Sequence, residues 1–153
     1  MIKEIEFKEI YPIWSKELWP ERNDIRKVSS MTYNKGTYME VYNYKFSIPK
    51  FLAYFNEGKI VGVNSLHLVS KLECRSRGLW VNTEHRGKGI GRKLLEHTIE
   101  LGKLYNCNYI WSLPRRESLS VYLTAGFEKT SEWINEGVLY GPNCYVCKRY
   151  SHL

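Results

Sequence analysis

The pattern of hydrophobic and polar residues is clearest in the middle of the chain. Two runs rich in Val, Ile, Leu and aromatic residues, 50–55 and 59–69, flank an Asn-Glu-Gly turn and together predict a β-hairpin. A further strand-like run covers residues 72–81. From about residue 89 to residue 105 the apolar residues recur at helical spacing, which predicts an amphipathic helix with one buried face.

The ends of the chain predict shorter elements. They are a strand over 2–7, a helical run that Pro12 opens and Pro20 ends, a strand over 109–113, a helix over 117–125 closed by Gly126, and a final hairpin of 127–134 and 138–150. Residues 23–46 are rich in tyrosine and predict no regular element. Strands with helices interposed predict an α/β or α+β fold. The 153 residues contain no repeat or linker, which predicts one domain over 1–153.

Composition narrows the class of protein. The hydrophobic fraction is 43% and the charged fraction 25%, which are ordinary values for a globular chain. The longest apolar runs are a few residues, so no membrane span is expected, and the N-terminus does not resemble a signal peptide. The net charge of +7 favours an anionic partner, either nucleic acid, an acidic lipid surface or a phosphorylated cofactor. Nucleic acid is the weaker choice, because the basic residues are scattered and form no known binding motif.

The four cysteines predict neither a metal site nor a disulfide framework. Cys144 and Cys147 have the spacing of a metal-binding pair, but the sequence offers no second pair to complete a site. An offset of three within a strand also points the two thiols to opposite faces. A chain of this length can build its core without disulfides, so we expect free, reduced cysteines in a cytoplasmic protein.

A glycine-rich turn is the most informative stretch of the sequence. Glycines stand at alternate positions 87, 89 and 91, after a buried strand and directly before the amphipathic helix. The first amides of a helix have no partner within the helix and carry its positive dipole end, so such a turn can hold an anion. Arg86, Lys88 and Arg92 add positive charge around it. The spacing fits neither the Walker A motif nor the dinucleotide fingerprint.

Two motifs in this order resemble those of the Gcn5-related N-acetyltransferase (GNAT) superfamily. Arg86-x-x-Gly89-x-Gly91 after Leu79-Trp80-Val81 resembles the acyl-CoA-binding motif, and Ser118-x-x-x-Tyr122-x-x-x-Gly126-Phe127 resembles the helix and Gly-Phe that follow in this family. The resemblance covers residues 50 to about 150. It implies the GNAT fold, a mixed and mostly antiparallel sheet of seven strands with helices on both faces, in which two central strands splay apart to admit acetyl-CoA.

The resemblance also assigns roles around coenzyme A. It implies that the amides of Gly87, Gly89, Gly91 and Arg92 hold the pyrophosphate, as a helix N-terminus favours. The backbone of Val81 would pair with the pantetheine arm as an added strand does. The amide of Leu79 would face the acyl oxygen and stabilise the oxyanion that develops there.

Acyl transfer to an amine requires a proton donor for the leaving thiolate and a route for the amine proton. Tyr122 occupies the position of the tyrosine of the family and is the candidate general acid; plain packing is its alternative role. Where many relatives carry Glu or His on the preceding strand, this chain has Arg75 and Arg77, which accept no proton near neutral pH. Glu73 shares their face and is the candidate base acting through water, or else it forms an ion pair. Weaker base candidates are Glu40 and His67.

These features predict an acetyl-CoA-dependent N-acetyltransferase that acts on a small-molecule amine or a protein amine. A GNAT-fold module that binds coenzyme A without catalysis is the alternative. Arg75 and Arg77 recognise a carboxylate or phosphate of the substrate in one interpretation and form surface ion pairs in the other. Residues 12–46 are expected to form part of the acceptor wall, and the hairpin edge at 138–150 offers a surface for a homodimer.

Overall fold

A seven-stranded sheet forms the centre of the protein. The computed structural model describes residues 1–22, 25, 29–34, 37–42 and 49–150, with only the backbone described for 29–34 and 37–42. The strand order is β1–β4–β5–β6–β7–β9–β8, and only β6 and β7 run parallel. The strands are β1 (Ile2–Ile5), β4 (Lys50–Asn56), β5 (Lys59–Leu68), β6 (Glu73–Val81), β7 (Tyr109–Ser112), β8 (Glu128–Lys129) and β9 (Val146–Arg149).

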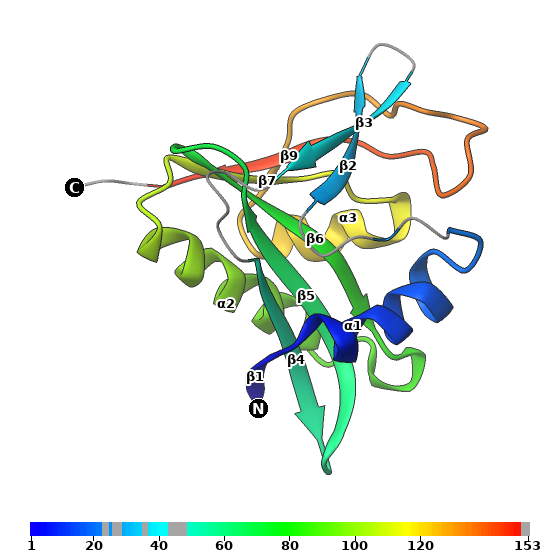
Figure 1. The fold of residues 1–153 in the computed structure, drawn as a ribbon, viewed down its shortest axis with the longest axis vertical. Helices are drawn as coiled ribbons and strands as arrows, with labels where there is room; N and C mark the ends of the chain where they lie inside the picture. The colour runs from blue at the N-terminus through cyan, green and yellow to red at the C-terminus, as the bar shows by residue number, and fades with distance from the viewer. Residues whose placement is uncertain (23–24, 26–28, 35–36, 43–48, 151–153) are drawn as a thin grey trace.

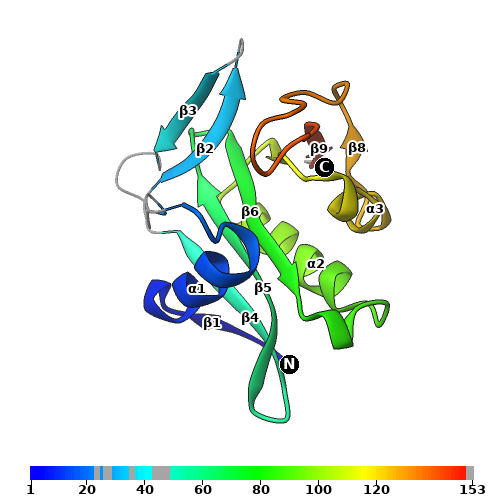
Figure 2. The ribbon, with the colours of Figure 1, turned by 90° about the vertical axis from the view of Figure 1, so that its right-hand side faces the viewer.

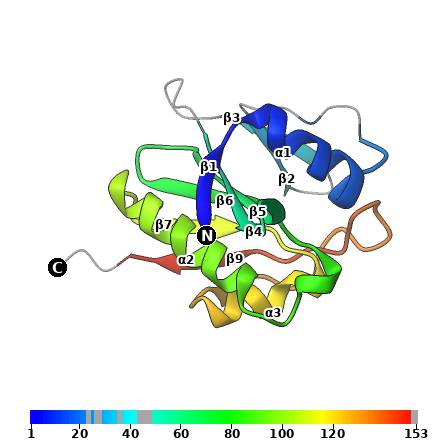
Figure 3. The ribbon, with the colours of Figure 1, turned by 90° about the horizontal axis from the view of Figure 1, so that it is seen from below.

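Helices cover both faces of this sheet. One face carries α1 (Phe7–Ile13), a π-helical turn η1 (Trp14–Leu18) and the hairpin of β2 (Ser29–Asn34) and β3 (Thr37–Tyr42), as Figures 1 and 2 show. The other face carries α2 (Ile90–Leu104) and α3 (Arg116–Thr124) (Figure 3). The predicted fold, mixed and mostly antiparallel with helices on both faces, is confirmed. None of the described helices is both long and apolar enough to cross a membrane.

The parallel strands β6 and β7 diverge towards one end of the sheet. Glu73–Arg75 of β6 lie opposite Tyr109–Trp111 of β7, but β6 continues to Val81 whereas β7 ends at Ser112. The amide of Asn82 donates to Val61 of β5 at 2.8 Å. Because peptide groups of successive strand residues point to opposite edges, the peptide of Val81 points away from β5. The last residues of β6 therefore present their backbone to an opening instead of to a neighbouring strand.

A β-bulge sets the direction of this end of β6. Val63 lies opposite Trp80, but Ser65 lies opposite Arg77, so Gly78 and Leu79 of β6 together face the single residue Asn64 of β5. The φ angle of Gly78 is +76°, and the ring of Trp14 fills the space where a Cβ would stand. The indole of Trp14 donates a hydrogen bond to the Gly78 carbonyl at 2.9 Å. Only glycine meets both the backbone and the packing requirement here.

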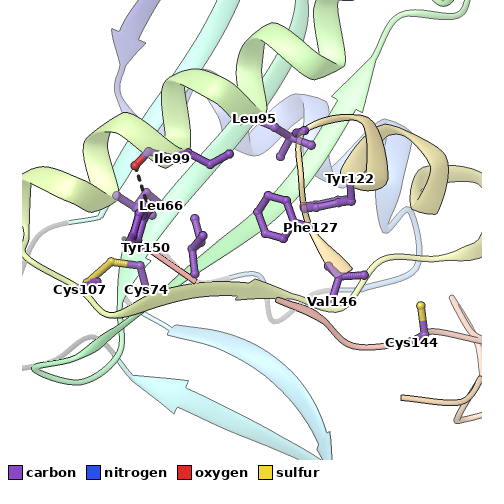
Figure 4. Close-up of a cluster of buried hydrophobic side chains, with 12 residues drawn as sticks. Leu66, Cys74, Leu95, Ile99, Cys107, Tyr122, Phe127, Cys144, Val146 and Tyr150 are labelled. Atoms are coloured by element: carbon purple, nitrogen blue, oxygen red, sulfur yellow. Dashed lines mark hydrogen bonds between the residues drawn. A yellow bond between two sulfur atoms is a disulfide. The ribbon is translucent and has the colours of Figure 1, made fainter. Parts of the chain in front are cut away.

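Buried side chains form a core on each side of the sheet. Under α2 and α3 the core includes Leu95, Ile99, Ile110 and Val146, and Figure 4 shows most of this cluster around Tyr122 and Phe127. On the opposite face Ile10, Trp14 and Ile25 pack against Phe51, Ala53 and Val63 of the sheet. The two cores fix the sheet from both faces, so the splayed end of β6 has a rigid base.

The first helix begins earlier than the sequence pattern predicts. Helix α1 starts at Phe7, and Pro12 lies inside it instead of opening it. A capping box explains the start: the amide of Glu6 donates to the Glu9 carboxylate at 2.7 Å, and the Glu6 side chain accepts from the third residue of the helix. The sequence-based prediction took Pro12 as the start of the helix and did not consider the pair of Glu6 and Glu9.

The final hairpin is much shorter than predicted. Strands β8 and β9 pair over Glu128–Lys129, and residues 134 and 143 form only an isolated bridge. Strand β9 lies between β7 and β8, and β8 pairs with it only at Val146 and Cys147. The expected homodimer at residues 138–150 stays a prediction. Some of the residues between β8 and β9 instead lie beside the diverging parts of β6 and β7.

The expectation of four free cysteines is wrong for one pair. Cys74 of β6 and Cys107, just before β7, form a disulfide (Figure 4), whereas Cys144 and Cys147 are free. The two bridged residues are 33 positions apart in sequence. The parallel pairing of β6 with β7 brings them together, and the hydrophobic pattern alone does not reveal that pairing.

We expect Gly78→Ala to lower the free energy of unfolding by roughly 2–4 kcal/mol, because it adds both backbone strain and a clash with Trp14. Gly58→Ala is the matched control, since Gly58 has a φ of +75° and open space at its Cβ position. This control should cost only about 1 kcal/mol. Urea unfolding of the two variants measures the difference, and equal losses would contradict the role assigned to Trp14.

Candidate functional site

A cavity of about 330 Å³ lies at the point where β6 and β7 diverge. Its floor comes from the ends of both strands, one wall from α3, and the opposite wall from η1 and the residues that follow it. The loop after β8 closes it from above. The described lining residues are Leu18, Trp19, Arg22, Arg75, Arg77, Gly78, Leu79, Ser112, Leu113, Pro114, Arg115, Ser118, Tyr122, Val138, Leu139, Tyr140 and Asn143. The predicted site residues Leu79 and Tyr122 thus share one cavity.

The glycine turn forms an open cradle at the N-terminus of α2. Gly89 is the N-cap, with a φ of +81°, and no atom lies within 4 Å of the position that a Cβ would take at Gly87 or Gly89. The first helical amides, beginning at Ile90, have no acceptor within the helix. The open space at the Cβ positions of Gly87 and Gly89 leaves room beside these amides for an anion. At Gly91 the reason for glycine differs, because a Cβ there would lie 3.0 Å from Val121 of α3.

The basic side chains around the turn have defined positions. Arg86 donates from Nε to the carbonyl of Val81 at 2.9 Å, which ties the turn to the end of β6. Arg92 forms an ion pair with Glu96 at 2.7 Å along the exposed face of α2. Lys88 is exposed at the rim. Together they place positive charge beside the cradle without filling it.

Tyr122 is buried with its hydroxyl in a polar network. Only 2% of the residue is exposed, and its hydroxyl lies 2.9 Å from Ser76 Oγ and accepts a hydrogen bond from Ser112 Oγ at 3.0 Å. Its ring meets Phe127 edge to face (Figure 4). Burial raises the pKa of Tyr122, and the two serines and Arg75 offset only part of that rise. The phenol therefore carries its proton at neutral pH and can donate it.

The network continues behind Tyr122 through residues that the sequence analysis missed. Asn64 donates to Ser76 Oγ and to Thr98 Oγ1, each at 2.9 Å, and Thr98 donates in turn to the Leu94 carbonyl. Asn64, Ser76 and Thr98 are fully buried. A polar residue at an inward position of an apolar strand or helix is the signal that could have identified them.

Arg75 and Arg77 are buried, so the interpretation that places them on the surface is wrong. They are 7% and 4% exposed and occupy alternate positions on the face of β6 that α1 and η1 cover. The Arg75 guanidinium lies 4.7 Å from the centre of the Trp111 ring. The Arg77 guanidinium lies 4.7 Å from the ring centre of Trp14. Burial lowers the pKa of Arg75 to about 10, which still leaves it charged at neutral pH.

The candidate bases lie away from the reaction centre. Glu73 is half-buried at the far end of β6, where it lies opposite Tyr109. The pKa of Tyr109 is raised by the burial of its own ring and then by the charge and hydrogen bond of Glu73. His67 is fully buried and 3.0 Å from Ser65 Oγ. The side chain of Glu40 lies outside the described residues. The described cavity lining contains no Asp, Glu or His, so the route of the amine proton stays a prediction.

Fold and site now agree with one family. A sequence model of the acetyltransferase (GNAT) family matches residues 10–127 of this chain. That span includes the glycine cradle, the splayed strands and Tyr122. The chain therefore belongs to the GNAT acetyltransferase family. Among curated proteins, none matches it.

Solved structures of the same fold include relatives with coenzyme A. Ard1 from Thermoplasma volcanium is 18% identical, with a TM-score of 0.68, over 99% of this chain and 98% of that one. PaiA N-acetyltransferase from Thermoplasma acidophilum, in complex with coenzyme A, is 20% identical, with a TM-score of 0.56, over 67% of this chain and 61% of that one. A GNAT family acetyltransferase from Elizabethkingia anophelis with acetyl-CoA bound is 18% identical, with a TM-score of 0.55, over 67% of this chain and 76% of that one. These likenesses show the fold.

His67 makes stability depend on pH. Burial, then the charges of Arg77 and Arg75, hold the pKa of His67 well below its usual value of 6.5. Below pH 6.5 the unfolded chain therefore binds a proton at this residue that the folded protein does not, and stability falls as the pH falls. The loss is about 1.4 kcal/mol per pH unit until the lowered pKa is reached.

We expect His67→Gln to remove this contribution from the pH dependence of stability. Urea unfolding at several pH values between about 5 and 8 measures it, with the exposed His97→Gln of α2 as the matched control. A wild-type slope in the His67 variant would show that the imidazole is protonated in the folded protein.

Proposed function

We propose that this protein is an acetyl-CoA-dependent N-acetyltransferase that acetylates a primary amine. The observation that carries the proposal is the free edge of β6, which runs between an open anion cradle and a buried, protonated tyrosine. Leu79 and Tyr122 line the same cavity, and the peptide of Val81 points into the opening next to it. An extended thioester laid along this edge would bring its reactive carbonyl to the cavity.

The glycine turn and the end of β6 would hold the pyrophosphate and the pantetheine arm of coenzyme A. The amides of Gly87, Gly89, Gly91 and Arg92 would hold the pyrophosphate at the helix N-terminus. Val81 would pair with the pantetheine arm through its amide, since its carbonyl already accepts from Arg86. Arg86 and Lys88 would lie beside the phosphates, where their charge favours binding.

The bound cosubstrate would supply an activated acetyl group as a thioester. The amide of Leu79, re-aimed by the bulge at Gly78, would donate a hydrogen bond to the oxygen on which negative charge develops. Tyr122 would hold a proton at its hydroxyl for the leaving sulfur. Arg75 acts on the titration of Tyr122 as a nearby positive charge, so it would stabilise the phenolate that remains.

The amine proton would leave through water. Glu73 stays the candidate end point of that route, although its carboxylate interacts with Tyr109 outside the described cavity lining. A cytoplasmic location is proposed from the use of acetyl-CoA, a metabolite of that compartment. The cysteines no longer support it, because Cys74 and Cys107 are bridged.

We expect titration calorimetry to show micromolar binding of acetyl-CoA, and Gly89→Ala to weaken it about tenfold, or about 1.4 kcal/mol. An alanine at a φ of +81° strains the backbone and moves the amides of the cradle. Gly58→Ala imposes the same kind of strain in a hairpin turn remote from the cradle and should keep wild-type affinity. No binding of acetyl-CoA at millimolar concentration would refute the cosubstrate assignment.

We expect Tyr122→Phe to lower kcat by about a hundredfold or more, with affinity for acetyl-CoA within about twofold of wild type. Release of the coenzyme A thiol, followed over pH with an amine that the protein acetylates, measures this. Equal activity in the variant would contradict the general-acid role of Tyr122.

The same assay on Glu73→Gln tests the base. A water route that ends at Glu73 requires this variant to have a lower kcat/KM and a shifted acid limb of the pH profile. Binding without turnover on any amine would favour the non-catalytic alternative.

A further inference from the structure

The hydroxyl of Tyr122 meets one serine from each of the two diverging strands. Ser76 of β6 lies 2.9 Å from it, and Ser112 at the end of β7 lies 3.0 Å from it. Ser76 is fully buried and Ser112 is 4% exposed. A hydroxyl carries one proton and can donate or accept, so the groups around each serine decide the direction of its bond. The direction matters, because a general acid must keep its own proton free for the leaving group.

The neighbours of Ser76 decide which way its proton points. Thr98 of α2 donates its single hydroxyl proton to the carbonyl of Leu94 at 2.7 Å. Thr98 can therefore only accept from Asn64, whose amide nitrogen lies 2.9 Å from its oxygen. The same amide nitrogen donates to Ser76 Oγ at 2.9 Å. Because an amide NH2 group has two protons, both bonds form at once and fix the orientation of the Asn64 side chain.

Ser76 accepts from Asn64 and so has its own proton left to donate. Two acceptors are within reach, the Tyr122 oxygen at 2.9 Å and Asn64 Oδ1 at 3.2 Å. The contact with Tyr122 is the shorter one. It also gains strength as negative charge develops on the phenol oxygen, because a hydrogen bond to a charged acceptor is about twice as strong as a neutral one. The chain of donors therefore runs from Asn64 through Ser76 to Tyr122.

Ser112 is placed to donate to Tyr122 from the other strand. Its hydroxyl also reaches the carbonyl of Ser76 at 2.8 Å, so its proton has two acceptors. Rotation of the hydroxyl alone redirects the bond from one acceptor to the other, and no heavier atom needs to move. When both serines donate, the Tyr122 oxygen accepts two hydrogen bonds and its own proton is left for the cavity, which Tyr122 and Ser112 both line.

The rest of the network lies inside the protein. Asn64, Ser76 and Thr98 are fully buried, and none of them belongs to the described cavity lining. Among the described hydrogen bonds, the chain ends at the carbonyl of Leu94, which has no proton to pass on. The network therefore orients hydroxyl groups and does not conduct a proton away from Tyr122.

We infer that Ser76 is a positioning residue for Tyr122 and that Asn64 sets the direction in which Ser76 donates. Ser76 and Ser112 hold the phenol oxygen, and the phenolic proton is thereby directed to the leaving sulfur. This inference rests on the proposed acetyltransferase function and adds to it two residues outside the described cavity lining.

The two serine bonds act on both states of the tyrosine. The O–H bond of Tyr122 breaks as the S–H bond of coenzyme A forms, and the proton that the amine loses to water then restores the phenol. Burial raises the pKa of Tyr122, and its bonds to Ser112 and Ser76 offset part of that rise. Loss of either bond leaves a weaker acid and a less stable phenolate.

A double-mutant cycle separates positioning through Tyr122 from a general effect on the fold. We expect Ser76→Ala to lower kcat about tenfold, as the loss of a hydrogen bond to a charged group would, with affinity for acetyl-CoA and KM for the amine within about twofold of wild type. In a Tyr122→Phe background the same change should lower kcat less than about twofold, because the group on which Ser76 acts is gone. Thiol release with an amine that the protein acetylates measures all four proteins.

Asn64→Asp tests the direction of the chain. A carboxylate oxygen at this position accepts where the amide donates, so the proton of Ser76 turns away from Tyr122. We expect kcat to fall at least as far as in Ser76→Ala. If Ser76→Ala does not fold, Ser76→Cys replaces it with the same expectation, because a thiol is close in size but donates only weakly.

Ser131→Ala is the matched control. The Ser131 hydroxyl accepts from the amide of Tyr145 and donates to the carbonyl of Glu132, each at 2.8 Å, outside both the network and the described cavity lining. Its loss should lower stability in urea unfolding but leave kcat within about twofold of wild type.

The possible failures are distinguishable. If acetyl-CoA does not bind, or no amine is acetylated, the proposed function fails and this inference fails with it. If Tyr122→Phe is impaired but Ser76→Ala keeps wild-type kcat, or lowers it equally in both backgrounds, only the positioning role is overturned. If Tyr122→Phe turns over too slowly to measure, the control decides, and an equal loss of kcat in Ser76→Ala and Ser131→Ala overturns the positioning role.

Discussion

The contact between Trp14 and Gly78 is the constraint on which the site depends. The indole fills the space that a side chain at residue 78 would need, and the left-handed backbone of Gly78 favours glycine there. The hydrogen bond from the indole to the Gly78 carbonyl fixes the bulge. The bulge turns the last residues of β6 away from β7 and leaves their peptide groups facing an opening. The π-helical turn η1, which begins at Trp14, therefore constrains the geometry of a strand 64 residues further along the chain.

Two kinds of buried polar group meet at this opening, and they are stabilised differently. The hydroxyl of Tyr122 belongs to a network with Ser76 and Ser112, whose hydrogen bonds offset the cost of burial. The guanidinium groups of Arg75 and Arg77 lie on indole rings, which offer a favourable face to a cation. The first arrangement keeps a proton in place, and the second keeps positive charge in place.

The sequence by itself determined the elements whose causes are local. Helical periodicity identified α2, the Asn-Glu-Gly turn identified the β4–β5 hairpin, and alternating glycines before a helix identified the anion cradle, because each depends on neighbouring residues. Only the tertiary structure decided the Cys74–Cys107 bridge, the burial of Arg75 and Arg77, and the approach of the 138–143 loop to the cavity. Those features join residues tens of positions apart, and their energies come from packing and pairing across the sheet, which no local pattern encodes.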